Sequence, residues 1–436
     1  MRDTSTSLFS LPRRSLIAGA IFGLTAVLIG TPAGAQFRVE ITGVGGSQLP
    51  IAIADFRDEA KSGQPLAAII RADLERSGQF TSKDTSGAQL FEGSTINFSE
   101  WRTKGADALA AGSAAKLADG RWDIRYKLFD VVKGADLGGE AQAVAPDDAR
   151  LAAHRVADSI YQKLTGERGV FATRMAYVSK IGGRYTLRIT DSDGEGGQVA
   201  LASPMPIISP AWSPDGRELA YVSFESNKAV VWVQDIFTGK RRKLADFRGS
   251  NSAPAFSPDG KKLAVTLSRA GGSQLFLIDR DGGNVQRITQ SLAIDTEPVF
   301  APDGASLFFV SDRGGGPQVY RMASSGGNAA RVTFSGGYNI SPSISPDGRT
   351  LTYITREGGS AFRLCVMDLA SGTVQKITDT TADERPSFAP NGRLIVYATR
   401  VSGHDVLMTT TLDGRVKAKL TSAADVREPT WGPFGR

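Results

Sequence analysis

Side chains that could carry chemistry are scarce in this chain. Its 436 residues include two histidines, His154 and His404, and one cysteine, Cys365. The histidines lie far apart, one on an expected helix and one in an expected turn, and neither has a partner at metal-ligand spacing, so we expect both at the surface. Cys365 lies in an apolar run, which favours an inert buried thiol over a nucleophile. There is no Gly-x-Ser-x-Gly elbow, and we expect no enzyme activity, no catalytic residue, no metal and no cofactor.

Two charged stretches have ordinary structural interpretations. The acidic run from Asp191 to Glu195 weakly resembles a calcium loop, but it lacks the closing glutamate and is interpreted as a hairpin turn. The basic run from Lys240 to Lys243 follows the turn residues Thr238 and Gly239, which favours a solvated strand edge over a nucleic-acid contact. The sequence therefore indicates no nucleic-acid partner.

The dominant feature is instead a turn motif that recurs in the second part of the chain. The prolines of five copies are 44 residues apart, and a degraded sixth copy follows after 43 residues. Another proline stands four residues before each of them. A fixed period of this length indicates a repeat architecture. The copies are Ser213–Gly216, Ser257–Gly260, Ala301–Gly304, Ser345–Gly348, Ala389–Gly392 and Gly432–Gly435.

Each repeat predicts four strands. In one repeat they are residues 254–257, 262–267, 274–278 and 285–289. The second and third strands are apolar on both faces, so each sheet must be covered on both sides. Four strands per repeat, stacked face to face, predict a β-propeller.

The closure of the ring can also be predicted. Residues 175–179 match the second strand of a repeat, but no turn motif precedes them. The missing strand is residues 429–432 at the far end of the chain, which would complete the first blade and remove an open edge. We therefore predict a six-bladed propeller over residues 169–436.

The chain begins with the pattern of a signal peptide over residues 1–35. Basic residues precede the apolar run Leu16–Ile29, and Ala33–Ala35 is a small-residue cleavage site. Export by the twin-arginine route stays open beside the general route. Removal of this segment lowers the net charge from +6 to +4, leaving 48 basic and 44 acidic residues. We expect an exported mature chain without a membrane span.

Residues 36–168 lack the repeat and predict a small α/β domain with an N-terminal arm, residues 36–46. The overall prediction is an α+β two-domain protein, in which this domain precedes a six-bladed β-propeller closed by the C-terminal strand. The arm could pair as an edge strand or be a frayed terminus. The expected strands are 49–56, 106–114, 122–132 and 138–144. The expected helices are 64–77, a short one at Trp101, and one that begins at Pro146 and ends before Gly166.

This arrangement resembles the TolB family, the periplasmic propeller proteins of the Tol-Pal system. The resemblance covers essentially the whole mature chain, with the departure that residues 106–114 are richer in alanine than the family's valine-rich strand. It implies a periplasmic, non-catalytic monomer that supports outer-membrane integrity and constriction at cell division. The motifs that carry it are the Pro-x-Trp-Ser-Pro-Asp-Gly repeat and residues 72–80, 163–166, 173–178 and 431–434.

The resemblance also implies two partners. The family binds the lipoprotein Pal through one face of the propeller and the periplasmic part of TolA through its arm. Loops that lead into the innermost strands gather on one face, and we expect the Pal contacts there. The expected Pal residues are Ser250, Asn251, Ala253, Thr296, Glu297, Asp383, Glu384, Arg385 and Glu428; the expected TolA residues are Gln36, Phe37, Arg38, Val39, Glu40 and Ile41.

A second hypothesis is the propeller of an exported hydrolase or glycan-binding protein. It requires a catalytic domain or paired carboxylates at the channel mouth. Only about 133 residues separate the expected cleavage site from the propeller, too few for a hydrolase domain of ordinary size.

Overall fold

The structure is a computed structural model that describes residues 48–269, 271–356, 358–420 and 425–435. The predicted signal peptide and the predicted arm lie outside these ranges. None of the helices within them combines the length and apolar character that a bilayer crossing requires.

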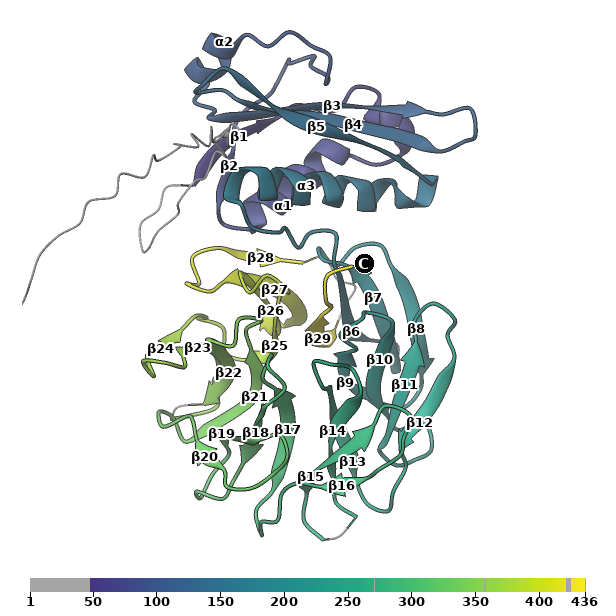
Figure 1. The fold of residues 1–436 in the computed structure, drawn as a ribbon, viewed down its shortest axis with the longest axis vertical. Coiled ribbons are helices and arrows are strands. Elements are labelled where there is room, and N and C mark those ends of the chain that lie inside the picture. Colours follow the sequence, from purple (N-terminus) through teal and green to yellow (C-terminus); the bar gives the residue numbers. More distant parts are fainter. Residues whose placement is uncertain (1–47, 270, 357, 421–424, 436) are drawn as a thin grey trace, which may run out of the picture. The chain divides into compact units, whose positions relative to one another are not determined.

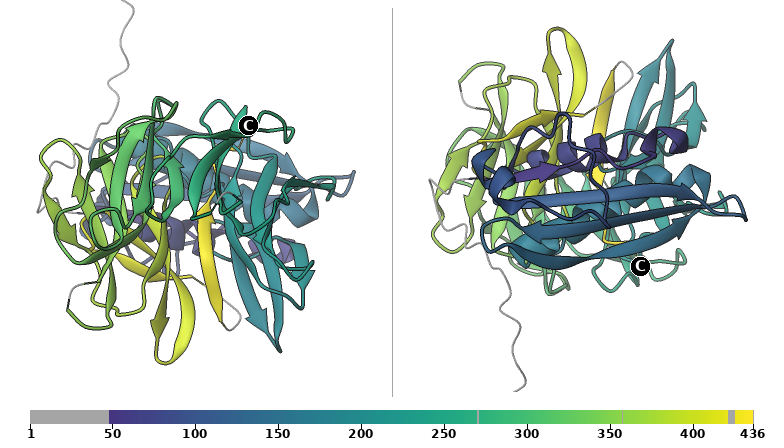
Figure 2. Two further views of the ribbon diagram at one scale, coloured as in Figure 1. Left: turned by 90° about the horizontal axis from the view of Figure 1, so that it is seen from below. Right: turned by 90° about the horizontal axis from the view of Figure 1, so that it is seen from above.

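The first part of the described chain forms one five-stranded mixed sheet in the order β2-β1-β3-β4-β5 (Figure 1). Strand β1 runs parallel to β2 and β3, and the remaining pairs are antiparallel. The right view of Figure 2 shows the long strands β3 to β5 side by side in blue. The strands are β1 (Leu49–Ile53), β2 (Phe80–Ser82), β3 (Ala108–Lys116), β4 (Trp122–Asp130) and β5 (Ala135–Val144).

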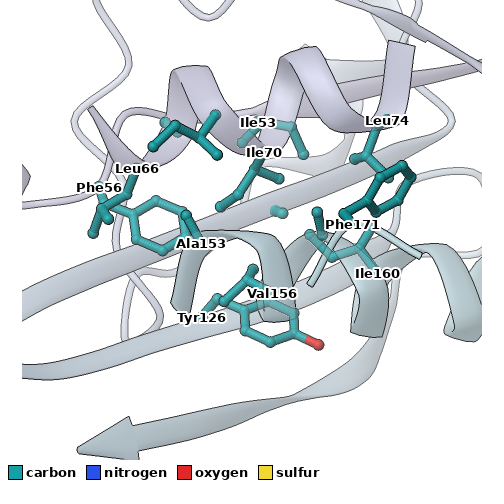
Figure 3. Packing of buried hydrophobic residues seen from close by; sticks show 14 of the residues in the cluster. Ile53, Phe56, Leu66, Ile70, Leu74, Tyr126, Ala153, Val156, Ile160 and Phe171 are labelled. Carbon is teal, nitrogen blue, oxygen red and sulfur yellow. The ribbon is translucent and has the colours of Figure 1, made fainter. Parts of the chain in front are cut away.

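Two helices bury their apolar faces against this sheet: α1 (Leu66–Arg76) and α3 (Ala149–Thr165). Figure 3 shows Ile70 and Leu74 of α1 packed with Val156 and Ile160 of α3. The 3.6-residue spacing of these side chains explains why the segments form helices. Helix α3 follows a 3-10 turn at Pro146–Asp148 and ends at Gly166, whose φ of 76° favours glycine.

A short third helix, α2 (Phe98–Thr103), contributes to a second cluster of buried side chains. Its N-terminal cap, Asn97, accepts a hydrogen bond from the backbone N–H of Glu100. Trp101 is 2% exposed and packs with Leu109 and Phe129 of the sheet. The predicted strands and helices of this part are confirmed, with ends shifted by a few residues.

The rest of the chain forms six four-stranded antiparallel sheets, which confirms the propeller. Figure 1 shows the innermost strands gathered round the centre. They are β29 (Val426–Trp431), β9 (Ile207–Trp212), β13 (Asn251–Phe256), β17 (Asp295–Phe300), β21 (Tyr338–Ile344) and β25 (Glu384–Phe388). The second strands are β6 (Arg174–Ile181), β10 (Glu218–Ser223), β14 (Lys262–Leu267), β18 (Ser306–Ser311), β22 (Thr350–Arg356) and β26 (Leu394–Val401).

The third and fourth strands complete each blade. The third strands are β7 (Arg184–Asp191), β11 (Val230–Asp235), β15 (Gln274–Asp279), β19 (Gln318–Ala323), β23 (Phe362–Asp368) and β27 (His404–Thr411). The outermost strands are β8 (Gln198–Ser203), β12 (Arg241–Ala245), β16 (Gln286–Arg287), β20 (Ala330–Arg331), β24 (Val374–Lys376) and β28 (Lys417–Lys419). The second strands are almost wholly buried, as expected for sheets covered on both faces.

The predicted closure of the ring is confirmed. The C-terminal strand β29 pairs with β6 and supplies the innermost strand of the first blade. Trp431 is 5% exposed, and its indole N–H donates to Oγ1 of Thr173 over 2.8 Å. The first blade is therefore built from both ends of the propeller sequence, which leaves β6 without an open edge.

The repeated turn joins the first two strands of each of the five blades that follow the first blade. In the first copy, the Ser213 hydroxyl donates to Asp215 over 2.6 Å, and Asp215 also accepts the backbone N–H of Arg217 over 3.0 Å. Gly216 closes the turn with φ of 67°. The turn lies at the opposite end of the innermost strand from the loop that enters it, so its role is structural.

The two predictions for histidines have different outcomes. His404 is exposed, as expected. The surface prediction for His154 is wrong: its ring is fully buried and hydrogen-bonded to Asp73. Its partners are distant in sequence, so no local spacing could indicate them. Cys365 is 1% exposed, which confirms a buried thiol.

The two charged stretches fold as predicted. The acidic run from Asp191 to Glu195 lies in the hairpin turn between β7 and β8. The basic run lies on the outermost strand β12, where Arg241 pairs with Glu225 and Lys243 pairs with Asp246.

Candidate functional site

The loops between blades meet the innermost strands at one face, which we call the entry face. Equivalent residues lie 44 positions apart, or 43 before the closing strand, so the face can be described by three consecutive positions where each innermost strand begins. The first of the three is Ile207, Asn251, Asp295, Asn339, Asp383 or Val426. The three positions have different environments, and these decide which predicted residues are available to a partner.

The first position holds the loop in place. Asn251 is fully buried, and its side-chain amide donates to the carbonyls of Ala229 and Phe247, both over 3.0 Å. Asp383 is 3% exposed and accepts hydrogen bonds from the Thr399 hydroxyl and the Leu364 N–H. Both were expected partner residues. Their polar atoms are used within the protein.

The second position is the more accessible one. Thr296 is half-buried and receives a 3.4 Å hydrogen bond from the Thr266 hydroxyl. Ser250, one residue before β13, is exposed. Arg427 on β29 is exposed as well. These side chains have free surface at the entry face.

The third position is a bulge in every innermost strand. Its residue has a left-handed backbone although it is never glycine, and the pairing with the second strand shifts register there. Such a conformation costs about 1–2 kcal/mol for an L-residue with a side chain. Proline follows each time, and its missing N–H suits a place where pairing is broken. The six residues are Ser209, Ala253, Glu297, Ser341, Arg385 and Glu428, with φ between 48° and 57°.

The bulges border the central channel. A cavity of about 150 Å³ there is lined by Ala253, Glu297 and Arg385 together with the prolines that follow the bulges. Strained residues often gather where the backbone must present groups to a ligand. The repetition of the bulge in all six blades makes the channel mouth the best candidate site.

Charged bulge residues also tie neighbouring blades together. Glu297 accepts the backbone N–H of Ser341 in the next blade over 2.7 Å. Glu428 accepts the N–H of Ser209 over 3.0 Å and the Nε–H of Arg385 over 2.6 Å. Three of the expected partner residues therefore shape the channel mouth by contacts across blades.

Glu384 lies beside two cavities of about 280 and 370 Å³ at the same face. Both cavities are also lined by Arg400, Asp405 and Arg427. Asp405 accepts hydrogen bonds from Arg400 and Arg427, each at 2.8 Å. Burial, and then the charge of Glu428, raise the pKa of Glu384 above its ordinary value.

Sequence reasoning missed part of this region. Arg400 and Asp405 lie on β26 and β27, which the repeat pattern marks only as buried strands. Arg427 is the second residue of β29, where an innermost strand begins, so its position was a usable signal. The side chains meet because the last blade and the closing strand are brought together by ring closure.

Three large apolar side chains are also exposed in the entry loops. Leu292 and Ile294 precede β17 with relative exposures of 108% and 53%, and Phe334 precedes β21 at 74%. Exposed apolar side chains beside polar ones are typical of protein interfaces. The sequence could have indicated these three side chains, because they are apolar residues in otherwise polar loops.

The arrangement is suited to recognition of a surface or a side chain. The entry face offers a narrow channel mouth, ion pairs already satisfied within the protein, and exposed apolar residues. Among the residues that the structure describes, no group of three or more His, Cys, Asp and Glu side chains is placed to hold a metal ion.

Comparison with protein families finds two matches that together span most of the chain. Residues 161–435 match the TolB beta propeller domain, and residues 37–137 match the TolB amino-terminal domain. Relatives named Tol-Pal system protein TolB include one from Polaromonas naphthalenivorans, 60% identical over 248 residues, and one from Bordetella pertussis, 52% identical over 240 residues. The matched segments cover 56% and 55% of this chain and the same shares of the relatives, so each match spans about half of either length.

Solved structures give a wider match. TolB from Acinetobacter baumannii is 39% identical, with a TM-score of 0.82 over 89% of this chain and 97% of that one. A chain of a nidogen–laminin complex matches with a TM-score of 0.51 at 12% identity, which shows a shared fold alone.

Proposed function

Since the chain belongs to the TolB family, we propose that it is a non-catalytic periplasmic scaffold of the Tol-Pal system. In this role it binds the lipoprotein Pal through the entry face and the periplasmic part of TolA through residues 36–46. The propeller match over residues 161–435 carries the proposal. The names of the relatives support membership of the Tol-Pal system.

The geometry of the entry face supports three different roles for the expected Pal residues. Ser250, Thr296 and Glu384 contact the partner, since they lie at the surface or beside an open cavity. Asn251 and Asp383 hold their loops. The remaining residues, Ala253, Glu297, Arg385 and Glu428, shape the channel mouth.

The apolar side chains of the entry loops extend this surface. Leu292 and Ile294 stand just before Thr296 in the chain, and Phe334 stands in the next entry loop. A large apolar group buried on binding supplies more affinity than a rim ion pair does. We therefore assign these three residues to the Pal interface as anchors.

The TolA contact rests on the arm, residues Gln36 to Ile41. Its alternating apolar residues suit strand addition to a partner sheet. The propeller residues take no part in this contact, and the domain bounds 36–168 and 169–436 separate the two binding functions. Export by the signal peptide over residues 1–35 places both in the periplasm.

Binding of the soluble domain of Pal to the mature chain tests the proposal by titration calorimetry. Thr296→Lys should weaken Pal binding at least tenfold, about 1.4 kcal/mol, because a long cation is introduced at the half-buried second position. Ala305→Lys is the matched control, since Ala305 is exposed and directly follows the repeated turn of the same blade. Wild-type affinity of Thr296→Lys would exclude the entry face as the Pal site.

Deletion of residues 36–46 provides the complementary measurement. It should abolish capture of the periplasmic part of TolA and leave Pal affinity unchanged. Loss of both activities would indicate damage to the fold, which the thermal unfolding temperature reports. Failure of the intact mature chain to bind either partner would refute the scaffold function.

A further inference from the structure

A cluster of charged side chains lies where α1 and α3 meet the hairpin between β7 and β8, away from the entry face. His154 is fully buried, and Asp73 and Arg76 are 1% and 7% exposed. Arg174 is exposed at the edge of this cluster. We call this group the ionic cluster; its members are Asp73 and Arg76 on α1, Arg150, His154 and Asp158 on α3, and Arg174, Asp191 and Asp193 at the ends of β6 and β7.

The imidazole of His154 faces carboxylates on both sides. Its Nδ1–H donates to Oδ2 of Asp73 over 2.5 Å. Its Nε2 lies 3.6 Å from Oδ2 of Asp193 and 4.0 Å from Oδ2 of Asp191, and it has no hydrogen-bond partner. With the proton on Nδ1, a neutral ring would direct the lone pair of Nε2 at two carboxylates. A second proton on Nε2 turns this repulsion into attraction.

With all four carboxylates ionised, the charges of the cluster balance only when His154 is protonated. The carboxylates of Asp73, Asp158, Asp191 and Asp193 oppose the guanidinium groups of Arg76, Arg150 and Arg174, which leaves one negative charge uncompensated. The imidazolium supplies the missing positive charge. An unbalanced buried charge is strongly destabilising, whereas a complete network is tolerated.

The cluster spans two parts of the chain. The guanidinium of Arg76 donates to the carbonyl and to the hydroxyl of Ser192, each over 3.0 Å, and Ser192 is fully buried. Arg150 on α3 pairs with Asp193 of the hairpin. Polar contacts at the hairpin therefore depend on charged groups from both helices.

We propose that the ionic cluster is a proton-dependent latch, in which the imidazolium of His154 holds the β7–β8 hairpin against α1 and α3 and loss of its proton loosens that contact. No binding function of the entry face or the arm is required for this device. It makes the attachment of the first blade to the N-terminal helices sensitive to the pH around the protein.

The direction of the pH dependence follows from linkage. Burial lowers the pKa of His154, but Asp73, Asp193 and Asp191 outweigh burial and raise it above the ordinary value. Stability from such a group is fully present below the unfolded pKa of about 6.5 and is lost as pH rises through the folded pKa. The latch is therefore closed at acidic pH and opens on the alkaline side. Burial also raises the pKa of Asp158, to about 6, while the backbone N–H groups of Phe171 and Ala172 and the charge of His154 act to lower it.

The chain contains only two histidines, so proton NMR of the mature protein labelled at the imidazole carbon can follow both. His404→Gln assigns the signals, because His404 is exposed and carries no contact of the cluster. The His154 signal is expected to titrate above the ordinary histidine pKa of about 6.5. Titration of His154 at or below that value would overturn the latch.

Hydrogen exchange of residues 191–197 reports the hairpin itself. Its protection factor, corrected for intrinsic exchange, should fall as pH rises through the His154 midpoint. Asp193→Asn removes one carboxylate facing Nε2, so it should move both the midpoint and the loss of protection to lower pH. Asp147→Asn, an exposed position just before α3, is the matched control and should change neither.

A third variant separates the proton from the hydrogen bond. His154→Gln keeps a donor toward Asp73 but cannot take up a proton, so hairpin protection should lose its pH dependence. Hairpin protection that stays constant through the His154 titration in the wild type, or that keeps its pH dependence in His154→Gln, would refute the proposal.

Discussion

At the scale of single residues, Asn391 shows how one departure from a repeat acquires a structural role. It stands where the other four full copies of the turn have aspartate. Its side-chain amide donates to the carbonyl of Arg168 over 3.1 Å, while its Oδ1 accepts the N–H of Arg393. Aspartate could perform only the second task, because an ionised carboxylate has no hydrogen to donate. The amide thus joins this turn to the segment that precedes the propeller.

Asn391→Asp should lower the free energy of unfolding by about 0.5–1.5 kcal/mol, the net value of one hydrogen bond. Asp303→Asn is the matched control, since Asp303 has the same Ala-Pro-x-Gly neighbours and its Oδ1 accepts the N–H of Ala305. The amide of Asp303→Asn keeps that acceptor oxygen, so the free energy of unfolding should hardly change. If urea denaturation showed the same loss of unfolding free energy for Asn391→Asp and Asp303→Asn, the role given to the Arg168 carbonyl would be contradicted.

At the scale of elements, the bulge in each innermost strand is the device that distinguishes the entry face. It turns a regular strand into one that presents its bulge residue at the channel. Two alanines of β13 permit a direct test, because Ala253 has φ of 48° at the bulge and Ala255 lies in the regular strand beside it.

Ala253→Gly should change the unfolding free energy by less than about 0.5 kcal/mol, because relief of the left-handed strain offsets the entropy of glycine. Ala255→Gly brings no such relief of strain, so it should lower the free energy of unfolding by about 0.5–1 kcal/mol. Urea denaturation of both variants measures the difference. A larger loss for Ala253→Gly than for Ala255→Gly would mean that the bulge is unstrained.

At the scale of the whole molecule, ring closure is the feature on which the propeller depends. Strand β29 contacts both β25 and β9, so the innermost strands form an unbroken circle. The circle also brings Arg427 of β29 beside Asp405 of the last blade, which creates the cavity next to Glu384. A local change in β29 is therefore expected to have a global effect.

Trp431→Ala should lower the free energy of unfolding by about 3–5 kcal/mol, the usual range for truncation of a buried aromatic residue. The substitution removes both the packing of the indole and its hydrogen bond to Thr173. Trp212→Ala is the comparison at the equivalent position of the second blade, where the indole is only half-buried. Trp212→Ala should lower the free energy of unfolding by a smaller amount. Urea unfolding followed by circular dichroism measures both, and a smaller loss for Trp431→Ala would contradict closure through β29.

The sequence alone determined the features that repeat. The 44-residue period specified four strands per blade, because turn residues and strands covered on both faces leave a local pattern. The incomplete first and last repeats specified which strand closes the ring. The family could be predicted for the same reason, since its motifs are short and contiguous.

Only the tertiary structure decided what individual side chains do. Asn251 and Thr296 stand in adjacent positions of equivalent loops, yet one is buried in its loop and the other keeps free surface. His154 was expected at the surface and lies instead among carboxylates from two separate segments, helix α1 and the β7–β8 hairpin. Burial and electrostatic environment depend on contacts between residues far apart in the chain, and these contacts leave no local periodicity by which the sequence could indicate them.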